Sequence, residues 1–516
     1  MHVPAATINL SLVSHTNVGK TTLARTLLRE DVGEVRDRPH VTEISQAHVL
    51  IDSPQGDVLR LWDTPGFGDS ARLLKRLRAA GNPLGWLLTQ VWDRFTDRPF
   101  YSSQQALRNA RDESDVVLYL VNAAEDPASA GYVEVEMQIL GWIGKPVLLL
   151  LNQTGPPRGE AVDAAEEAGW VRHLNAYPWV RGGLGLDAFA RCWVQEDRLL
   201  STVRDVLTTP KREAFERLQD AWRQRNLQLF DAAMGTLAAQ LATVALDNET
   251  VTPQRLRDKA SRWLAAAVRG GEPRDPELER ASAALAKRLD GAVREATDRL
   301  LAVHGLSGRA GDEILARVAG QFEVSKAADV GTSGMIGGLV SGALGGLVAD
   351  LHAGGLTFGA GALIGGILGA LGASGAAQAY NLARGGESGA VGWSSAFLTQ
   401  RFVAALLRYL AVAHFGRGRG DWVEGEYPAH WQPLVEEVTR RRGAALEAVW
   451  AHASHAASRG EIEPGVARSE IEKALQPILS AAARDALLRL YPAAAGIFAA
   501  DKRLPDDQTM VKTVRA

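Results

Sequence analysis

Residues 14–23 read SHTNVGKTTL, and this stretch decides the fold of the N-terminal part of the chain. A phosphate-binding loop of the Walker A type has the pattern G-x-x-x-x-G-K-[ST]. Gly19, Lys20 and Thr21 fill the last three positions of that pattern, whereas Ser14 stands in place of the first glycine. Serine is small and tolerates an unusual backbone angle at modest cost, so the stretch still predicts a phosphate-binding loop.

The sequence on either side supports this interpretation. Residues 7–14, TINLSLVS, are typical of a strand, and residues 21–29 show the leucine spacing of a helix. In a strand–loop–helix unit, backbone N–H groups and the helix N-terminus face the phosphates. Lys20 would place a cation near the β- and γ-phosphates, and the Thr21 hydroxyl is a candidate Mg²⁺ ligand. The expected nucleotide-binding residues here are Ser14, Asn17, Val18, Gly19, Lys20, Thr21 and Thr22.

A second strand is predicted to end beside this loop, in the stretch DVLRLWDTPGFGD. Asp63 follows the apolar run and suits the surroundings of a metal ion, and the N–H of Gly66 is expected to approach a γ-phosphate. Thr42 is a candidate switch threonine that closes on Mg²⁺ only when a γ-phosphate is present; the alternative is an ordinary threonine of a strand edge. The predicted metal ligands are therefore Thr21, Thr42 and Asp63, and the predicted catalytic residues are Lys20, Thr42 and Gly66.

Further apolar runs indicate the fold class. QAHVLIDS, residues 46–53, is expected to pair with the strand before Asp63, and residues 115–123 and 145–152 read as two buried strands. Because helical patterns separate most of these runs, we expect an α/β domain with a mainly parallel sheet.

The motifs SHTNVGKT and DTPGF resemble those of the Era-like branch of the translation-factor class of GTPases. Over its full length, the chain is similar to a bacterial family that couples such a domain to a helical C-terminal region of unknown function. The resemblance implies GTP or GDP and Mg²⁺ as ligands, with Lys20, Thr21, Thr42, Asp63 and Gly66 in the roles described above. It also implies that Asn17 helps to hold a K⁺ ion beside the phosphates.

The guanine-reading motif N-K-x-D is incomplete. Residues 152–155 read NQTG, so Asn152 is in place for a base contact, with Gln153 beside it, but the discriminating acid is missing. Glu160, Asp163 and Asp187 are candidates to replace it. The resemblance favours GTP, and the alternative is an NTPase that does not select between purines.

Phe67 stands after Gly66, where Ras-like enzymes place the glutamine that orients the attacking water. We therefore expect slow hydrolysis, with the missing group supplied by a partner, by a homodimer through the switch region or by K⁺. His15 and His40 are the nearest alternative bases, although loop histidines without catalytic duty are the favoured interpretation. A non-enzymatic scaffold stabilised by nucleotide is the alternative function.

At 516 residues the chain is long enough for two or three domains. We expect the GTPase domain over residues 1–210 and an α-helical domain over residues 211–516, where long amphipathic segments dominate. An insertion of about residues 70–112 follows the switch segment. Its apolar and basic faces suit either a helix packed on the domain or a nucleotide-controlled contact with another surface.

A tract rich in glycine and alanine lies at about residues 330–383. Its glycines recur every four residues, which places them on one face of each of two helices. Faces of small residues serve tight helix pairs in membranes, and each uncharged run is about long enough to span one. We therefore expect a helical hairpin that associates with a membrane, and the alternative is a hairpin buried in protein.

Charge and cysteine content limit the partners and the cellular location that we expect. The formal charge of −3 gives no bulk attraction to nucleic acid, so a nucleic-acid partner is not expected. RNA or ribosome binding, which the Era-like resemblance alone implies, is the alternative. The single cysteine, Cys192, and the lack of a secretory pattern at the N-terminus fit the cytoplasm, with peripheral or integral attachment to the inner membrane if the 330–383 hairpin associates with lipid.

Overall fold

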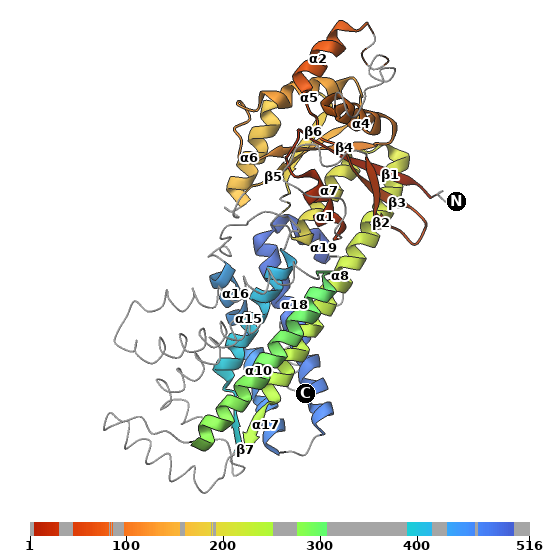
Figure 1. The fold of residues 1–516 in the computed structure, drawn as a ribbon. Coiled ribbons are helices and arrows are strands. Elements are labelled where there is room, and N and C mark those ends of the chain that lie inside the picture. Colours follow the sequence, from red (N-terminus) through yellow and green to blue (C-terminus); the bar gives the residue numbers. More distant parts are fainter. Residues whose placement is uncertain are drawn as a thin grey trace, which may run out of the picture. The chain divides into compact units, whose positions relative to one another are not determined.

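The computed structural model describes the chain in two compact units (Figure 1). The first holds the described residues of Met1–Gln228, Ala413–Pro428 and Leu487–Ala500, and the second holds those of Leu229–Val412 and Ala429–Ala486. The division falls inside helix α8 (Thr209–Leu246), and the expected domain boundary at residue 210 stays a prediction. The residues that the structure describes are 5–29, 45–81, 83, 85, 98–154, 160–186, 188, 192–250, 276–306, 390–414, 431–459 and 463–499.

The first unit is built on a six-stranded sheet with the strand order β2-β3-β1-β4-β5-β6. The edge strand β2 pairs with β3 antiparallel, and the other neighbours pair parallel. The mainly parallel α/β fold predicted from the sequence is thus confirmed. The strands are β1 (Thr7–Val13), β2 (Gln46–Asp52), β3 (Val58–Asp63), β4 (Val116–Asn122), β5 (Val147–Asn152) and β6 (Val180–Gly185).

Helices cover the sheet on both faces, which explains why β5 is apolar and buried along its whole length. Alternate residues of β4, Val117, Tyr119 and Val121, belong to a core cluster on one face. The helices that contribute to this cluster are α2 (Ser70–Ala79), α4 (Arg98–Asp112), α5 (Gly131–Gly141) and α6 (Glu160–His173). Helices α1 (Lys20–Leu28) and α7 (Trp193–Val206) lie on the opposite face (Figure 1).

The C-terminal end of the chain returns to the first unit. There the 3-10 turn Pro492–Ala494 and helix α19 (Ala495–Ala499) pack near α7, and the Phe498 ring meets the Trp193 ring edge-on at 5.9 Å between centroids. This return was not foreseen from the sequence, which carries no local pattern for a contact between residues so far apart.

Part of the expected insertion at 70–112 is described. Helix α2 buries Leu73, Leu74 and Leu77, so its predicted apolar face packs on the domain. The guanidinium groups of Arg72 and Arg76 lie 4.4 and 4.6 Å from the centre of the Phe100 ring of α4. Both arginines therefore serve the packing of α2 against α4.

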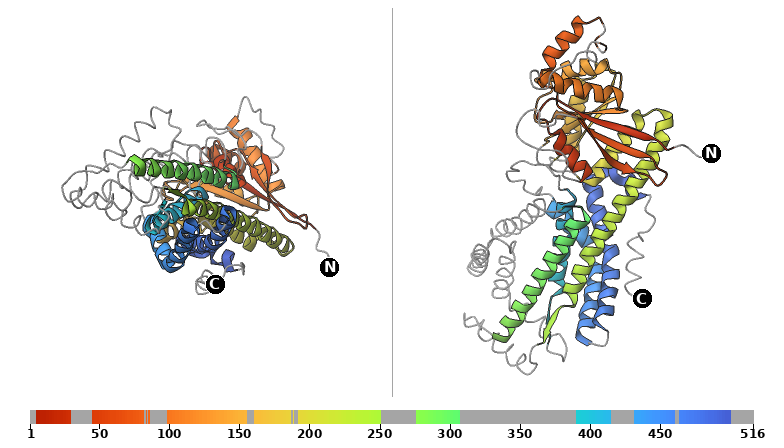
Figure 2. Two further views of the ribbon diagram at one scale, coloured as in Figure 1. Left: turned by 90° about the horizontal axis from the view of Figure 1, so that it is seen from below. Right: turned by 45° about the vertical axis from the view of Figure 1, so that its right-hand side comes forward.

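The second unit is helical, as predicted. A short antiparallel pair, β7 (Asn248–Thr250) and β8 (Ala390–Gly392), lies in it, and Arg288 of α10 pairs with Asp247 at 2.9 Å and with Glu249. Besides α8, its helices are α10 (Pro276–Val303), α15 (Ser395–Ala413), α16 (Trp431–Arg441), α17 (Gly443–Arg459) and α18 (Pro464–Leu490). Two further views of these helices are given in Figure 2. The tract at 330–383 lies outside the described residues.

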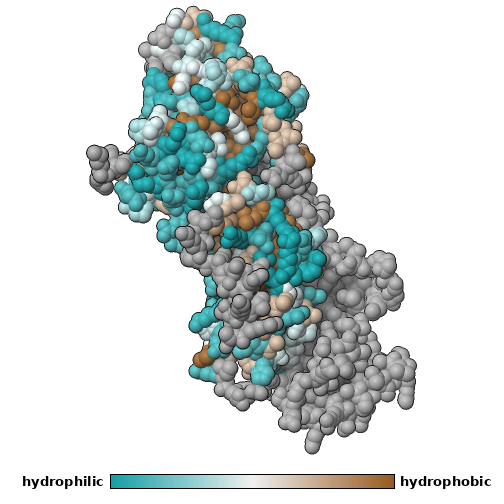
Figure 3. All heavy atoms as spheres, turned by 180° about the vertical axis from the view of Figure 1, so that it is seen from behind, coloured by the Kyte–Doolittle hydropathy of each residue, from teal (hydrophilic) through white to brown (hydrophobic). Residues whose placement is uncertain are grey.

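Two of the described helices, α8 and α15, are long and apolar enough to cross a membrane. The most apolar window of each is 61% buried in the protein, as is usual for the core helices of a protein that does not span a membrane. The face drawn in Figure 3 is largely hydrophilic over the described residues. Among these residues, the exposed large hydrophobic side chains are Val49, Val162 and Val466.

Candidate nucleotide site

The predicted phosphate-binding loop connects β1 to α1 and has two residues in the left-handed region. Asn17 has φ 66° and Gly19 has φ 93°. A side chain on Gly19 would also bring a Cβ within 2.6 Å of Asn152 Nδ2, so this position needs glycine for two reasons. Ser14, in contrast, is not among the described residues with positive φ. The backbone therefore does not require glycine there, and the departure from the motif costs no strain.

Gly19 also has no side chain that could cap the helix that follows it. The first N–H groups of α1 are left for another acceptor at the helix N-terminus, where the helix dipole favours negative charge. Val18 and Thr22, on either side of this turn, are 5% and 6% exposed. The local geometry is that of an anion-binding loop.

Lys20 lies across this loop and is almost fully buried. Its Nζ donates to Ser14 Oγ at 2.8 Å and to the His15 carbonyl at 3.1 Å. An ammonium group has three donors, so one N–H remains for a ligand. Burial lowers the pKa of Lys20 from 10.5 to about 8, while the charges of Asp63 and Glu136 act in the opposite direction. The residue that replaces the first glycine of the motif is thus a hydrogen-bond partner of the motif's lysine.

Two of the three predicted metal ligands meet at the end of β3. The Thr21 hydroxyl donates to Asp63 Oδ2 at 2.7 Å. Asp63 Oδ1 is buried and accepts no hydrogen bond within the described part of the chain. Burial raises the pKa of Asp63, although the Thr21 hydrogen bond and the Lys20 charge counteract this. A buried carboxylate oxygen without a donor, beside a hydroxyl, fits Mg²⁺, which prefers oxygen ligands. Thr42 and His40 lie outside the described residues.

The segment after Asp63 is held against the phosphate-binding loop by backbone hydrogen bonds. Phe67 N donates to the Ser14 carbonyl at 2.9 Å, and Thr16 N donates to the Phe67 carbonyl at 3.2 Å. A Cβ on Gly66 would lie 3.0 Å from Lys20 Nζ and from Thr16 Cα, so glycine is needed for this close approach. Both features place the Gly66 backbone next to the lysine, and the approach of its N–H to a γ-phosphate stays a prediction.

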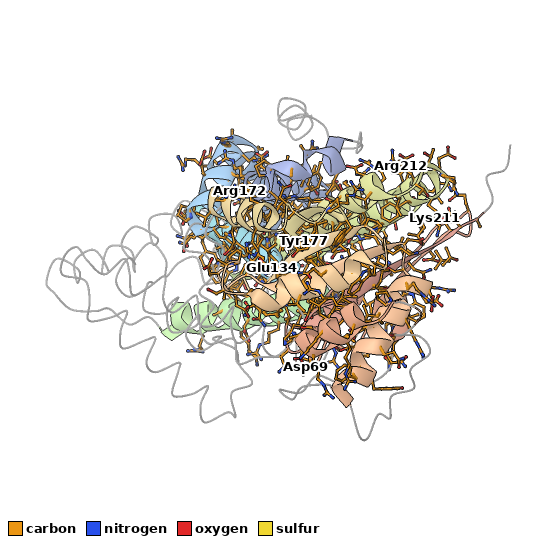
Figure 4. All side chains as sticks on the ribbon, turned by 90° about the horizontal axis from the view of Figure 1, so that it is seen from above. Asp69, Glu134, Arg172, Tyr177, Lys211 and Arg212 are labelled. Atoms are coloured by element: carbon orange, nitrogen blue, oxygen red, sulfur yellow. The ribbon has the colours of Figure 1, made fainter. Side chains whose placement is uncertain are left out.

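The Phe67 side chain points away from the loop into the core and is fully buried. It therefore presents nothing that could orient a water molecule. Two residues further on, Asp69 Oδ1 accepts from Arg72 N at 3.0 Å and caps α2. Figure 4 labels Asp69 among the side chains of this unit.

Asn152, predicted to contact a base, is fully buried and links three segments. Its Nδ2 donates to the Val18 carbonyl at 2.7 Å, and its Oδ1 accepts from Ala188 N at 2.8 Å. The next residue, Gln153, adopts φ 59°. Asn152 thus ties β5 to the phosphate-binding loop and to the segment after β6. Gly155 and Asp187 lie outside the described residues, and α6 begins at Glu160 and includes Asp163.

Sequence reasoning missed a buried network behind the loop. His15 Nδ1 lies 2.8 Å from Glu136 Oε1, and Tyr119 OH donates to Glu136 Oε2 at 2.5 Å. Glu136 is fully buried on α5, and the Tyr132 ring lies 4.7 Å from the His15 ring. Burial and the neighbouring carboxylate raise the pKa of Tyr119 well above its usual value. The one available signal was a glutamate at position 136 within the largely apolar stretch YVEVEMQIL.

Two family models match the chain. Residues 9–153 match the 50S ribosome-binding GTPase model, and residues 183–477 match a model described as domain of unknown function DUF3482. A curated relative, GTPase Era of Heliobacterium modesticaldum, is 28% identical over 144 residues. This match covers 28% of the chain and 38% of the relative, so the chain matches well under half of that protein's length.

Three solved structures show a distant likeness. An Aquifex aeolicus Era variant bound to GDP.AlF4⁻ has a TM-score of 0.28 and 17% identity, covering 39% of this chain and 57% of that one. Era in complex with MgGDPNP and a segment of 16S ribosomal RNA has a TM-score of 0.29 and 18% identity, covering 40% and 58%. An oligomerised bacterial dynamin pair has a TM-score of 0.21 and 11% identity, covering 92% and 77%. At such low TM-scores none of these likenesses supports a conclusion about function.

The N-terminal match confirms the resemblance that the motifs indicated, a P-loop GTPase domain related to Era. The second match begins within β6 and continues through most of the helical unit. Because this second model covers more than half of the chain, the protein belongs to the DUF3482 family, with an Era-related GTPase domain at its N-terminus.

Proposed function

We propose that the chain is a GTP-binding switch protein that hydrolyses GTP slowly with Mg²⁺. The observation that carries this proposal is the meeting of Lys20, Thr21 and Asp63 at one loop, where one buried oxygen of Asp63 has no donor among the described residues. The remaining N–H of Lys20 and the backbone N–H groups at the start of α1 would bind phosphate oxygens.

Thr21, at the start of α1, and Asp63, the last residue of β3, would hold the metal ion. The parallel pairing of β1 with β3 brings the loop that leads to α1 close to Asp63. Bound Mg²⁺ would neutralise charge on the β- and γ-phosphates. Gly66 would bring its N–H to the γ-phosphate, because its backbone already lies against the loop. Thr42 would complete the metal site when a γ-phosphate is present.

Slow turnover follows from Phe67. Its side chain lies in the core, so attack by water needs orientation from elsewhere. Asn17, in its left-handed conformation, would help to hold K⁺, and a homodimer through the switch region is the second possible source of the missing group. The same observation favours a second candidate function, a scaffold that binds nucleotide for stability and hardly turns it over.

We further propose that the nucleotide state is passed to the helical part of the chain, and that the tract at 330–383 associates with a membrane. Hydrolysis measured with and without K⁺, and with and without liposomes, tests this part. Turnover that stays negligible under all four conditions would favour the scaffold.

Calorimetry with GTP, GDP and ATP in Mg²⁺ tests the binding itself. The wild-type chain should bind GTP and GDP more tightly than ATP. Lys20→Ala should lose binding, whereas Lys75→Ala, which removes an exposed lysine of α2, should not. Equal affinity for ATP and GTP would show that the incomplete base motif leaves the pocket unselective. Unchanged affinity of Lys20→Ala would overturn the proposed site.

A further inference from the structure

Helix α15 carries one buried arginine, Arg408, and one partly buried arginine, Arg401. Arg408 is 4% exposed, and burial lowers its pKa to about 10, with the charge of Arg401 adding to the effect. Burial likewise lowers the pKa of Arg401 to about 10. An isolated buried cation is costly unless a negative charge compensates it.

No described carboxylate compensates these two charges. Arg408 Nη1 donates to Gln240 Oε1 of α8 at 3.0 Å, and this amide is neutral. Arg401 Nε is buried and has no hydrogen-bond partner in the described part of the chain. The residues of α15 itself, SAFLTQRFVAALLRYLAVA, include no acid. Elsewhere in the same unit, arginines such as Arg288 and Arg299 are paired with carboxylates.

The two arginines lie seven residues apart, which is close to two helical turns, so both are on one face of α15. The Arg401 guanidinium lies 4.9 Å from the centre of the Phe397 ring, and this ring stacks on Trp393 at 4.4 Å between centroids. The ring contact positions the guanidinium group, whose buried Nε has no hydrogen-bond partner in the described part of the chain. Guanidinium groups suit phosphate in particular, because they donate two parallel hydrogen bonds.

We propose that Arg401 and Arg408 form a binding site for a phosphate group, either free or on a lipid headgroup, with Gln240 positioning Arg408 and Phe397 positioning Arg401. The site is separate from the nucleotide site and does not depend on the function proposed above. Its occupant supplies the negative charge that the described residues lack.

The proposal predicts that removing Arg408 raises the stability of the protein and weakens its binding of phosphate. Arg408→Met should raise the stability of the protein in chloride buffer, because it removes an uncompensated buried charge. It should also weaken phosphate binding at least about tenfold, the effect of losing a hydrogen bond to a charged group. Arg401→Met should weaken binding similarly while the bond between Arg408 and Gln240 stays intact. Arg299→Met, which removes an exposed arginine of α10, is the matched control and should change neither quantity.

The experiment is done on the full chain carrying Lys20→Met, so that the nucleotide site does not contribute. Urea unfolding in chloride and in phosphate at equal ionic strength reports stability, and calorimetry with inorganic phosphate reports binding. Flotation with phosphatidylcholine vesicles, with and without phosphatidylglycerol, distinguishes a lipid phosphate from a free one. Binding in either arm that is lost in both arginine variants supports the site. If Arg408→Met and Arg401→Met destabilise the protein and phosphate has no effect in any arm, a carboxylate of the chain already compensates these arginines and the proposal is wrong.

Discussion

Replacing Lys20 by methionine should make the nucleotide-free protein more stable while it abolishes nucleotide binding. The ammonium group is buried, and its pKa lies at about 8 instead of 10.5. One pKa unit corresponds to about 1.4 kcal/mol, so burial of the charged form costs at most about 3.5 kcal/mol near pH 7. Methionine has a similar length and no charge. The His15 carbonyl keeps the Ser14 hydroxyl as a donor at 2.5 Å, so the substitution leaves no carbonyl unsatisfied there.

The stability difference between Lys20→Met and the wild type should also depend on pH, which gives a second test of the burial cost. Between about pH 8 and 10.5 the unfolded chain binds the Lys20 proton and the folded chain does not, so wild-type stability gains from this group as the pH rises through that window. Below pH 8 the lysine is charged in both states and its full cost is present. The advantage of Lys20→Met should therefore be about 1–3 kcal/mol at pH 7 and should vanish near pH 10.5.

Urea unfolding at several pH values, followed by tryptophan fluorescence, measures the effect. Lys75→Met is the control, because Lys75 is exposed on α2 and its charge stays in contact with water in the folded protein. A Lys20→Met protein that is less stable than wild type at pH 7, or an advantage that does not change with pH, would refute the burial argument. GTP should stabilise the wild type and leave Lys20→Met unaffected.

Four further substitutions test other parts of the first unit. Gly66→Ala should weaken GTP binding about tenfold and GDP binding less, because its methyl group would crowd Lys20 where the γ-phosphate is expected; equal losses by calorimetry would contradict this placement. Glu136→Ala should cost about 1–3 kcal/mol in urea unfolding, since it leaves the buried Tyr119 hydroxyl without an acceptor, and Tyr119→Phe should cost less. Asn152→Ala should weaken GTP and ATP binding alike, because the described contacts of its amide hold the phosphate-binding loop; a loss confined to GTP would instead indicate a base contact.

Local patterns were enough to predict the parts of the site that depend on neighbouring residues. The strand–loop–helix around Lys20 and the strand end at Asp63 follow from short apolar runs and from the Gly-Lys-Thr triplet, and parallel pairing of β1 with β3 then brings Asp63 to Thr21. The continuous burial of β4 follows in the same way from its apolar run, as expected for a strand of a sheet that is covered on both faces.

Contacts between distant residues could not be predicted. The pairing of His15 with Glu136 spans 121 residues, and the bond from Asn152 to Ala188 depends on the register of β5 and β6. The conformation and hydrogen bonding of Ser14 could not be predicted either, because the backbone angle at one position cannot be inferred from a motif. The sequence suggested a tolerated strain, whereas the structure shows an unstrained residue that binds Lys20.

Phe67 connects the phosphate-binding loop to helix α2 within the first unit. Its backbone is bonded on both sides to the phosphate-binding loop, through Ser14 and Thr16. Its side chain shares one core with Leu73 and Leu77 of α2 and with the residues of α5. Any ligand that moves Gly66 by pulling its N–H toward a phosphate must therefore either break these two hydrogen bonds or shift the base of α2. Cores respond to such shifts by repacking rather than by stretching. Under the proposed function, Phe67 would convert phosphate binding into a movement of α2. Slow hydrolysis and this coupling would then both follow from the same residue.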